Sequence, residues 1–204
     1  MIDLMREARE DLAFMKAVAE DKGPLPGLIG AHLLAVGLPF GLNFILVWAV
    51  FAGRAPWWPH GLVWATWVPG TLVYAPISLL LHLRGRSFTP GPTARLFFAA
   101  WASVGLIVLP ILAVMTIAQL KTGLAFAMVW PALSFVLWGG AWASLAIIRR
   151  KAWHGIMAVI SFATALASAA LIDAPEAWLV MAVGILLCVA APGAAIMRRA
   201  SWAT

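Results

Sequence analysis

The chain has 204 residues, of which 64% are hydrophobic and only 11% are charged, and its formal net charge is +6. A mean hydropathy of +0.96 excludes an ordinary soluble domain, because the surface of such a domain carries many more charged side chains. The positive charge is grouped at the ends of apolar segments, so it indicates membrane topology and not binding to nucleic acid.

The first 22 residues differ from the rest of the chain, since they contain six acidic and four basic residues. Apolar residues recur at helical spacing and predict an amphipathic helix that ends before Pro24. We therefore expect a short cytoplasmic element over residues 1–23 and a membrane domain over residues 24–204. The polar face is net negative, unlike that of a helix that lies on anionic lipid. Residues 1–22 are expected to contact protein, either the chain's own basic loops or a cytoplasmic or membrane partner.

Six apolar segments follow, each long enough to span a bilayer and bounded by charge, by Gly and Pro, or by Trp. They cover residues 27–52, 61–83, 95–120, 122–148, 152–172 and 177–197. The connections between them are short and leave no room for a further domain. The pattern predicts an all-α membrane protein, a bundle of six transmembrane helices in the lipid bilayer.

The basic residues between the segments predict the orientation of the bundle. With the amino terminus in the cytoplasm, the inner loops and the carboxyl-terminal tail carry eight Lys and Arg residues. The outer loops then carry only Arg54 and Lys121, so both termini are expected in the cytoplasm. Short loops and the lack of a glycosylation sequon favour a bacterial inner (plasma) membrane.

Small residues inside the segments predict close helix packing. Gly37 and Gly41 form a GxxxG pair, which allows two backbones to approach closely. Similar pairs are Gly140 with Ser144, and Ala163 with Ala167.

Prolines lie inside five of the segments, and each removes one backbone hydrogen bond from its helix. We expect the freed carbonyls to accept from neighbouring helices, from Ser and Thr, or from water. They are Pro39, Pro69, Pro76, Pro110, Pro131 and Pro192.

Tryptophan positions fit the same arrangement. Trp178 falls at a predicted outer end, where indole rings anchor at the headgroup level. Trp101, Trp138 and Trp142 lie deeper, and we expect them to pack between helices; the alternative is an aromatic lining for a ligand pocket.

Groups able to support chemistry are few. The predicted spans contain no Asp, Glu, Lys or Arg, which disfavours a proton-coupled pump. No nucleophile with a base, HExxH motif or phosphate-binding glycine loop occurs, so an enzyme is not expected. The lone Cys188 is expected to be a small core residue.

Three histidines share the predicted cytoplasmic level of the bundle: His32, His82 and His154. Imidazoles on facing helices can bind haem iron, zinc or copper, so these residues are a candidate metal or haem site. The alternative is that His82 and His154 are interfacial residues beside Arg and Trp. Because no CxxCH motif or carboxylate lies in the segments, we expect no cofactor.

Three functions are compatible with this pattern. The first is a non-catalytic accessory, assembly or signalling component of a membrane complex. The second is a small carrier or channel for a neutral or lipid-like solute, with Asn43 and Tyr74 as possible solute contacts. A water-accessible cavity that reaches either residue would favour this function. Asn43 follows Pro39 by four residues, where a freed carbonyl needs a donor. The third is a haem- or metal-binding redox subunit.

Overall fold

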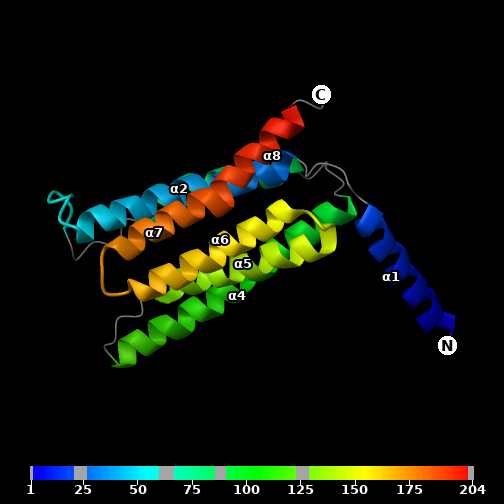
Figure 1. Cartoon of the computed structure of the whole chain (residues 1–204), viewed down its shortest axis with the longest axis horizontal. Helices are drawn as coiled ribbons and strands as arrows, with labels where there is room; N and C mark the ends of the chain where they lie inside the picture. The colour runs from blue at the N-terminus through cyan, green and yellow to red at the C-terminus, as the bar shows by residue number, and fades with distance from the viewer. Residues whose placement is uncertain (1, 21–26, 60–66, 86–90, 123–128, 202–204) are drawn as a thin grey trace.

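The computed structural model describes residues 2–20, 27–59, 67–85, 91–122 and 129–201, and all regular structure in these ranges is helical. A π-helical turn, Leu186–Ala190, joins the last two helices into one continuous rod (Figure 1). The helices are α1 (Ile2–Glu20), α2 (Gly27–Phe51), α3 (Trp67–Gly85), α4 (Pro92–Thr122), α5 (Val129–Arg149), α6 (Ala152–Ala170), α7 (Glu176–Ile185) and α8 (Ala191–Ser201).

Each predicted apolar segment corresponds to a helix, which confirms the all-α fold class and the helical bundle. Within the described residues, four stretches are long and apolar enough to cross a membrane: Gly27–Phe51, Pro131–Arg149, Ala152–Ala170 and Glu176–Arg199. Shorter apolar stretches occur in α3, at Leu72–Leu81, and in α4, at Ala94–Val104. Residues 61–66 and 123–128, which begin two of the predicted segments, lie outside the described residues.

The bundle has two layers, one containing α2, α3 and the α7–α8 rod and the other containing α4, α5 and α6 (Figure 1). Helix α2 packs against α3 on one side and against the α7–α8 rod on another. Helix α6 contacts both α5 and α7 and so connects the layers. The core between them is apolar and aromatic, with Trp142, Phe97 and Phe135 among the largest fully buried side chains.

Glycines allow α2 to lie directly against the carboxyl-terminal rod. A Cβ atom added at Gly37 would lie 2.6 Å from the backbone nitrogen of Ala190, and one at Gly30 would lie 2.7 Å from the Gly193 carbonyl oxygen. Neither distance is possible for a real side chain, so only glycine fits. The structure confirms that the Gly37 face makes a close helix contact.

The other two small-residue pairs do not form helix contacts. A Cβ atom at Gly140 would meet nothing within 4 Å, and the Ser144 hydroxyl donates to the Gly140 carbonyl of its own helix. Ala163 and Ala167 are exposed, while α6 buries Ser161, Thr164 and Ser168 instead. The predicted pairs are wrong because these apolar helices have no polar face to indicate which side is buried.

Pro192 shows how a freed carbonyl is satisfied. In an α-helix the residue at position 192 would donate to the Cys188 carbonyl, but proline has no N–H. The Trp142 Nε1–H of α5 donates to that carbonyl instead, over 3.0 Å and in the buried core. The adjacent π turn, in which the Ala191 N–H donates to the Leu186 carbonyl, is the distortion that accommodates the proline ring. The expectation of a donor from a neighbouring helix is confirmed here.

Helix α1 forms as predicted and projects from the end of the bundle where α2 begins and α8 ends (Figure 1). It contacts α4 and α5. Met5, Leu12 and Phe14 are nevertheless exposed, with 62% of Leu12 accessible. These three apolar side chains of α1 therefore do not pack against the bundle.

Candidate functional site: a groove between α2 and α3

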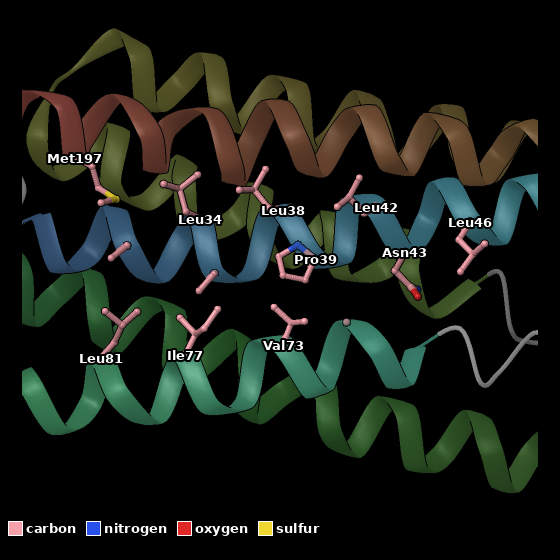
Figure 2. A pocket seen from close by; sticks show the side chains of 13 residues that line it. Leu34, Leu38, Pro39, Leu42, Asn43, Leu46, Val73, Ile77, Leu81 and Met197 are labelled. Carbon is pink, nitrogen blue, oxygen red and sulfur yellow. The ribbon is translucent and has the colours of Figure 1, made fainter.

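A groove of about 600 Å³ runs between α2 and α3. Its size is typical of sites that bind a whole small molecule. Figure 2 shows Pro39 and Asn43 of α2 and Val73, Ile77 and Leu81 of α3 in the space between the two helices. Leu34, Leu38 and Leu42 project from the edge of α2 that faces the carboxyl-terminal helix, and Met197 of α8 lies at one end. The lining is aliphatic apart from one amide: Ala31, Leu34, Ala35, Leu38, Pro39, Leu42, Asn43, Leu46, Gly70, Val73, Ile77, Leu81 and Met197.

Two features of the sequence create the groove. Gly70 presents no side chain to α2, and a Cβ atom added there would lie 3.6 Å from the Pro39 carbonyl oxygen, an ordinary contact distance. Pro39 lies inside α2 and removes the N–H that would bond to the Ala35 carbonyl. A small residue on one helix and a proline on the other thus leave space where α2 and α3 face each other.

Asn43 is the one polar side chain in the lining. It is 5% exposed, and neither its amide nitrogen nor its amide oxygen has a hydrogen-bond partner among the described residues. Its side chain points toward the α2–α3 space (Figure 2). An unpaired buried amide costs about 1–3 kcal/mol. The expectation that Asn43 donates to a carbonyl freed by Pro39 is therefore wrong for the carbonyls that the structure describes, and both polar atoms of the amide are buried.

Tyr74, the second predicted solute contact, lies beside the groove but does not line it. Its ring packs against Phe40, with ring centroids 5.9 Å apart. Tyr74 is thus a packing residue of the α2–α3 interface. Sequence reasoning identified Asn43 but missed Gly70, for which the only signal was a glycine inside an apolar helix.

The groove opens onto a surface of exposed aliphatic side chains. Leu38 is 47% exposed and Leu42 is 64% exposed on the α2 side, and Val73 and Ile77 are exposed on the α3 side. In a membrane such side chains contact acyl chains. The groove is therefore reached from an apolar surface, which favours an apolar or amphiphilic ligand over an ion.

A cluster of aromatic rings occupies the core between α4, α5 and α6. Trp142 is fully buried, and its ring centroid lies 5.3 Å from that of Trp101 and 5.9 Å from that of Phe97. Trp138 packs against Phe135. None of these rings lines the α2–α3 groove, so they pack between helices as expected. Trp178 is 4% exposed and contacts Phe44, so the prediction that it is an interfacial anchor is wrong.

His154 is part of the same core. It is fully buried, and its ring stacks on Trp142 at 5.7 Å with an interplanar angle of 23°. Neither ring nitrogen has a hydrogen-bond partner among the described residues. The Trp153 ring also covers the His154 ring, and the two ring centroids are 3.9 Å apart. The alternative that places His154 at the membrane interface stays a prediction, since burial in the bundle does not give its depth in the membrane.

The predicted histidine site stays a prediction. The His32 ring meets Phe98 edge-on at 6.2 Å, whereas His154 stacks on Trp142, and the His82 side chain lies outside what the structure describes. Among the described side chains, no group of three His, Cys, Asp or Glu residues could hold a metal ion. Cys188 is fully buried, as expected of a small core residue.

A second, smaller groove of about 270 Å³ lies between α6 and the α7–α8 rod. Its lining combines aliphatic, aromatic and cationic side chains: Trp153, Met157, Leu187, Ala191, Pro192, Ala195, Ile196 and Arg199. Sequence reasoning did not identify this groove, because its residues come from segments more than thirty positions apart.

Comparison of the chain with known protein families, with characterised proteins and with solved structures finds no match in any of the three. The functional argument therefore rests on the residues and geometry of the two grooves.

Proposed function

We propose that the chain is a six-span integral membrane protein whose α2–α3 groove binds an uncharged, lipid-like molecule. The observation that carries this proposal is the buried, unpaired amide of Asn43 inside an otherwise aliphatic groove of about 600 Å³. The proposed role is binding or carriage of that molecule, without catalysis.

The lining determines the class of ligand. None of the described residues that line the groove is charged, so an ionic group placed beside them would lose its hydration without compensation. Aliphatic side chains favour acyl or isoprenoid chains, which they contact as lipid does. The lining therefore favours a ligand that places a long, uncharged hydrocarbon chain in the groove.

Asn43 adds the requirement for one polar group. Its amide offers both a donor and an acceptor, so a hydroxyl or an ester or amide carbonyl on the ligand would find a partner. Because a buried amide left unpaired disfavours binding, a pure hydrocarbon should bind more weakly than an amphiphile with such a group.

The test is to extract the protein from membranes in mild detergent and identify retained molecules by mass spectrometry. We expect a stoichiometric neutral amphiphile in the wild-type protein and about tenfold less of it in Asn43→Leu. Gly70→Leu, which fills the groove from the α3 side, should also remove it. Ser144→Leu removes an exposed polar group outside the groove and is the matched control. Equal retention in all four proteins would contradict the proposal.

The proposed orientation places both termini in the cytoplasm of a bacterial inner membrane. Helices α2, α6 and the α7–α8 rod begin or end where the basic residues cluster, with Arg149 closing α5 and Lys151 directly preceding α6. Reporter fusions after Lys151 and after Thr204 should report cytoplasm, and a fusion at Pro175 should report the outside. A cytoplasmic signal at Pro175 would contradict the six-span arrangement.

A second candidate function is an accessory component that contacts a protein partner through α1. The observation that favours it is the projection of α1 from the bundle with Leu12 62% and Met5 59% exposed (Figure 1). Deletion of residues 1–22 should leave the bundle folded in detergent and abolish co-purification of the partner. Unfolding of the truncated protein on its own would show that α1 is an internal brace instead.

A further inference from the structure

The groove between α6 and the α7–α8 rod differs from the α2–α3 groove in one decisive respect, the presence of a cation. Arg199 lines one end of it, whereas its remaining lining is apolar. We propose that this second groove binds one anionic phospholipid, with the headgroup phosphate at Arg199 and an acyl chain along α8. The proposal rests on the membrane insertion proposed above but not on the ligand of the α2–α3 groove.

The shape of the groove follows from the irregular part of the rod. Leu187 belongs to the π turn and Pro192 is the second residue of α8, and both line the groove. A π turn and a proline each displace a helix from its regular path. Ala191 and Ala195 supply short side chains along the same face, so an acyl chain has room to lie against the rod.

The length of the groove matches one leaflet of a bilayer. Leu187 and Arg199 are twelve positions apart, which corresponds to about 18 Å along a helix. One leaflet contributes about 15 Å to the hydrocarbon core. A chain that lies beside Leu187 would therefore bring its headgroup to the level of Arg199.

Charge supports an anionic headgroup. The only acidic residues beyond position 22 are Asp173 and Glu176, and Glu176 begins the rod that Arg199 nearly ends. Helix α1 carries five of the other six acids and contacts α4 and α5, and the sixth, Asp21, lies outside the described residues. No acidic side chain of α6 or α8 can therefore compete for Arg199. Lys151 and Arg198 lie near the same helix ends and add to the positive potential.

Trp153 indicates where the second groove lies relative to the lipid headgroups. Its half-buried ring lines the groove two positions after Lys151, at the end of the bundle where basic residues gather. Indole rings prefer the headgroup level, where arginine can reach a phosphate. Basic pockets between membrane helices bind anionic headgroups in this way.

The test measures the affinity of the full-length, delipidated protein for phosphatidylglycerol and phosphatidylcholine of identical acyl chains by native mass spectrometry. We expect phosphatidylglycerol to bind more tightly. Arg199→Gln should weaken phosphatidylglycerol about fivefold and leave phosphatidylcholine unchanged. Arg198→Gln is the matched control, since it removes the same charge one position away and outside the lining.

Two further variants separate this groove from the first. Ala195→Phe should reduce binding of both lipids by filling the groove, with thermal unfolding confirming that the variant is folded. Gly70→Leu, which fills the α2–α3 groove, should leave the phosphatidylglycerol affinity unchanged. Equal losses in Arg199→Gln and Arg198→Gln would overturn the proposal, because they would show a diffuse charge effect. Equal wild-type affinities for the two lipids would overturn it as well.

Discussion

Helix α2 forms two interfaces, one with the carboxyl-terminal rod and one with α3, and a glycine has a different role in each. Toward the carboxyl-terminal rod, Gly37 allows backbone contact, since an added Cβ atom would lie 2.6 Å from the Ala190 nitrogen. Toward α3, the facing glycine is Gly70, and a Cβ atom added there would lie 3.6 Å from the Pro39 carbonyl oxygen, an ordinary contact distance. Glycine therefore closes one interface and leaves the other open. The comparison shows that a glycine in a membrane helix does not by itself indicate the close backbone approach that Gly37 makes.

The largest expected effect comes from the closed interface. Gly37→Leu should destabilise the protein by about 3 kcal/mol, because the side chain would overlap the backbone of the π turn. The same substitution at Gly70 places its side chain in the groove and should change stability by about 0.5 kcal/mol or less. Thermal unfolding in detergent measures both. Equal, small effects would show that Gly37 faces lipid and would remove the distinction between the two interfaces.

An intermediate change in stability is expected where the rod meets α5. There the Trp142 Nε1–H donates to the Cys188 carbonyl in place of the N–H that Pro192 lacks. Trp142→Phe leaves the buried Cys188 carbonyl without that donor and should cost about 2 kcal/mol. Pro192→Ala restores a backbone N–H that can donate to the Cys188 carbonyl. In the Pro192→Ala variant, Trp142→Phe should therefore cost about 1 kcal/mol less than in the wild-type protein.

Trp138→Phe, on the same helix, is the matched control for this cycle, because its ring packs against Phe135 outside the rod interface. Unfolding of the single and double variants gives the coupling energy. Additive losses would show that the indole contributes through its size alone.

The smallest effect is expected in the open interface. Asn43→Leu removes two buried, unpaired polar atoms and should stabilise the delipidated protein by about 1 kcal/mol. The same variant should lose the neutral amphiphile, so stability and binding would change in opposite directions. Unfolding measured before and after lipid removal separates the two. A loss of stability in the delipidated protein would mean that the amide has a protein partner.

These contrasts also show the limits of reading membrane helices from sequence. Gly37 and Gly140 stand in equivalent small-residue patterns, yet only Gly37 meets another helix. Ser161, Thr164 and Ser168 are buried in α6, each donating to a carbonyl of its own helix, while Ala163 and Ala167 face outward. A helix that is apolar all round gives no periodicity that distinguishes lipid from a neighbouring helix. The rotation of each helix about its axis was therefore not predictable.

The sequence alone determined the helices themselves. Apolar segments bounded by charge predicted residues 27–52 and 152–172, and the structure has Gly27–Phe51 and Ala152–Ala170. This succeeds because a backbone without water must satisfy its own hydrogen bonds, which makes a long apolar run helical whatever it packs against. The sequence also singled out Asn43, since an amide at mid-depth is costly and therefore conspicuous.

Only the tertiary structure decided what surrounds those helices. The α2–α3 groove exists because Gly70 of one helix lies opposite Pro39 of another, and the second groove exists because Trp153 of α6 lies beside the rod that carries Arg199. Likewise, the Cys188 carbonyl finds its donor in Trp142, 46 positions away in the chain. Such pairings depend on how the helices rotate and pack. Packing energy is summed over many small contacts between distant residues, and no local pattern in the chain records that sum.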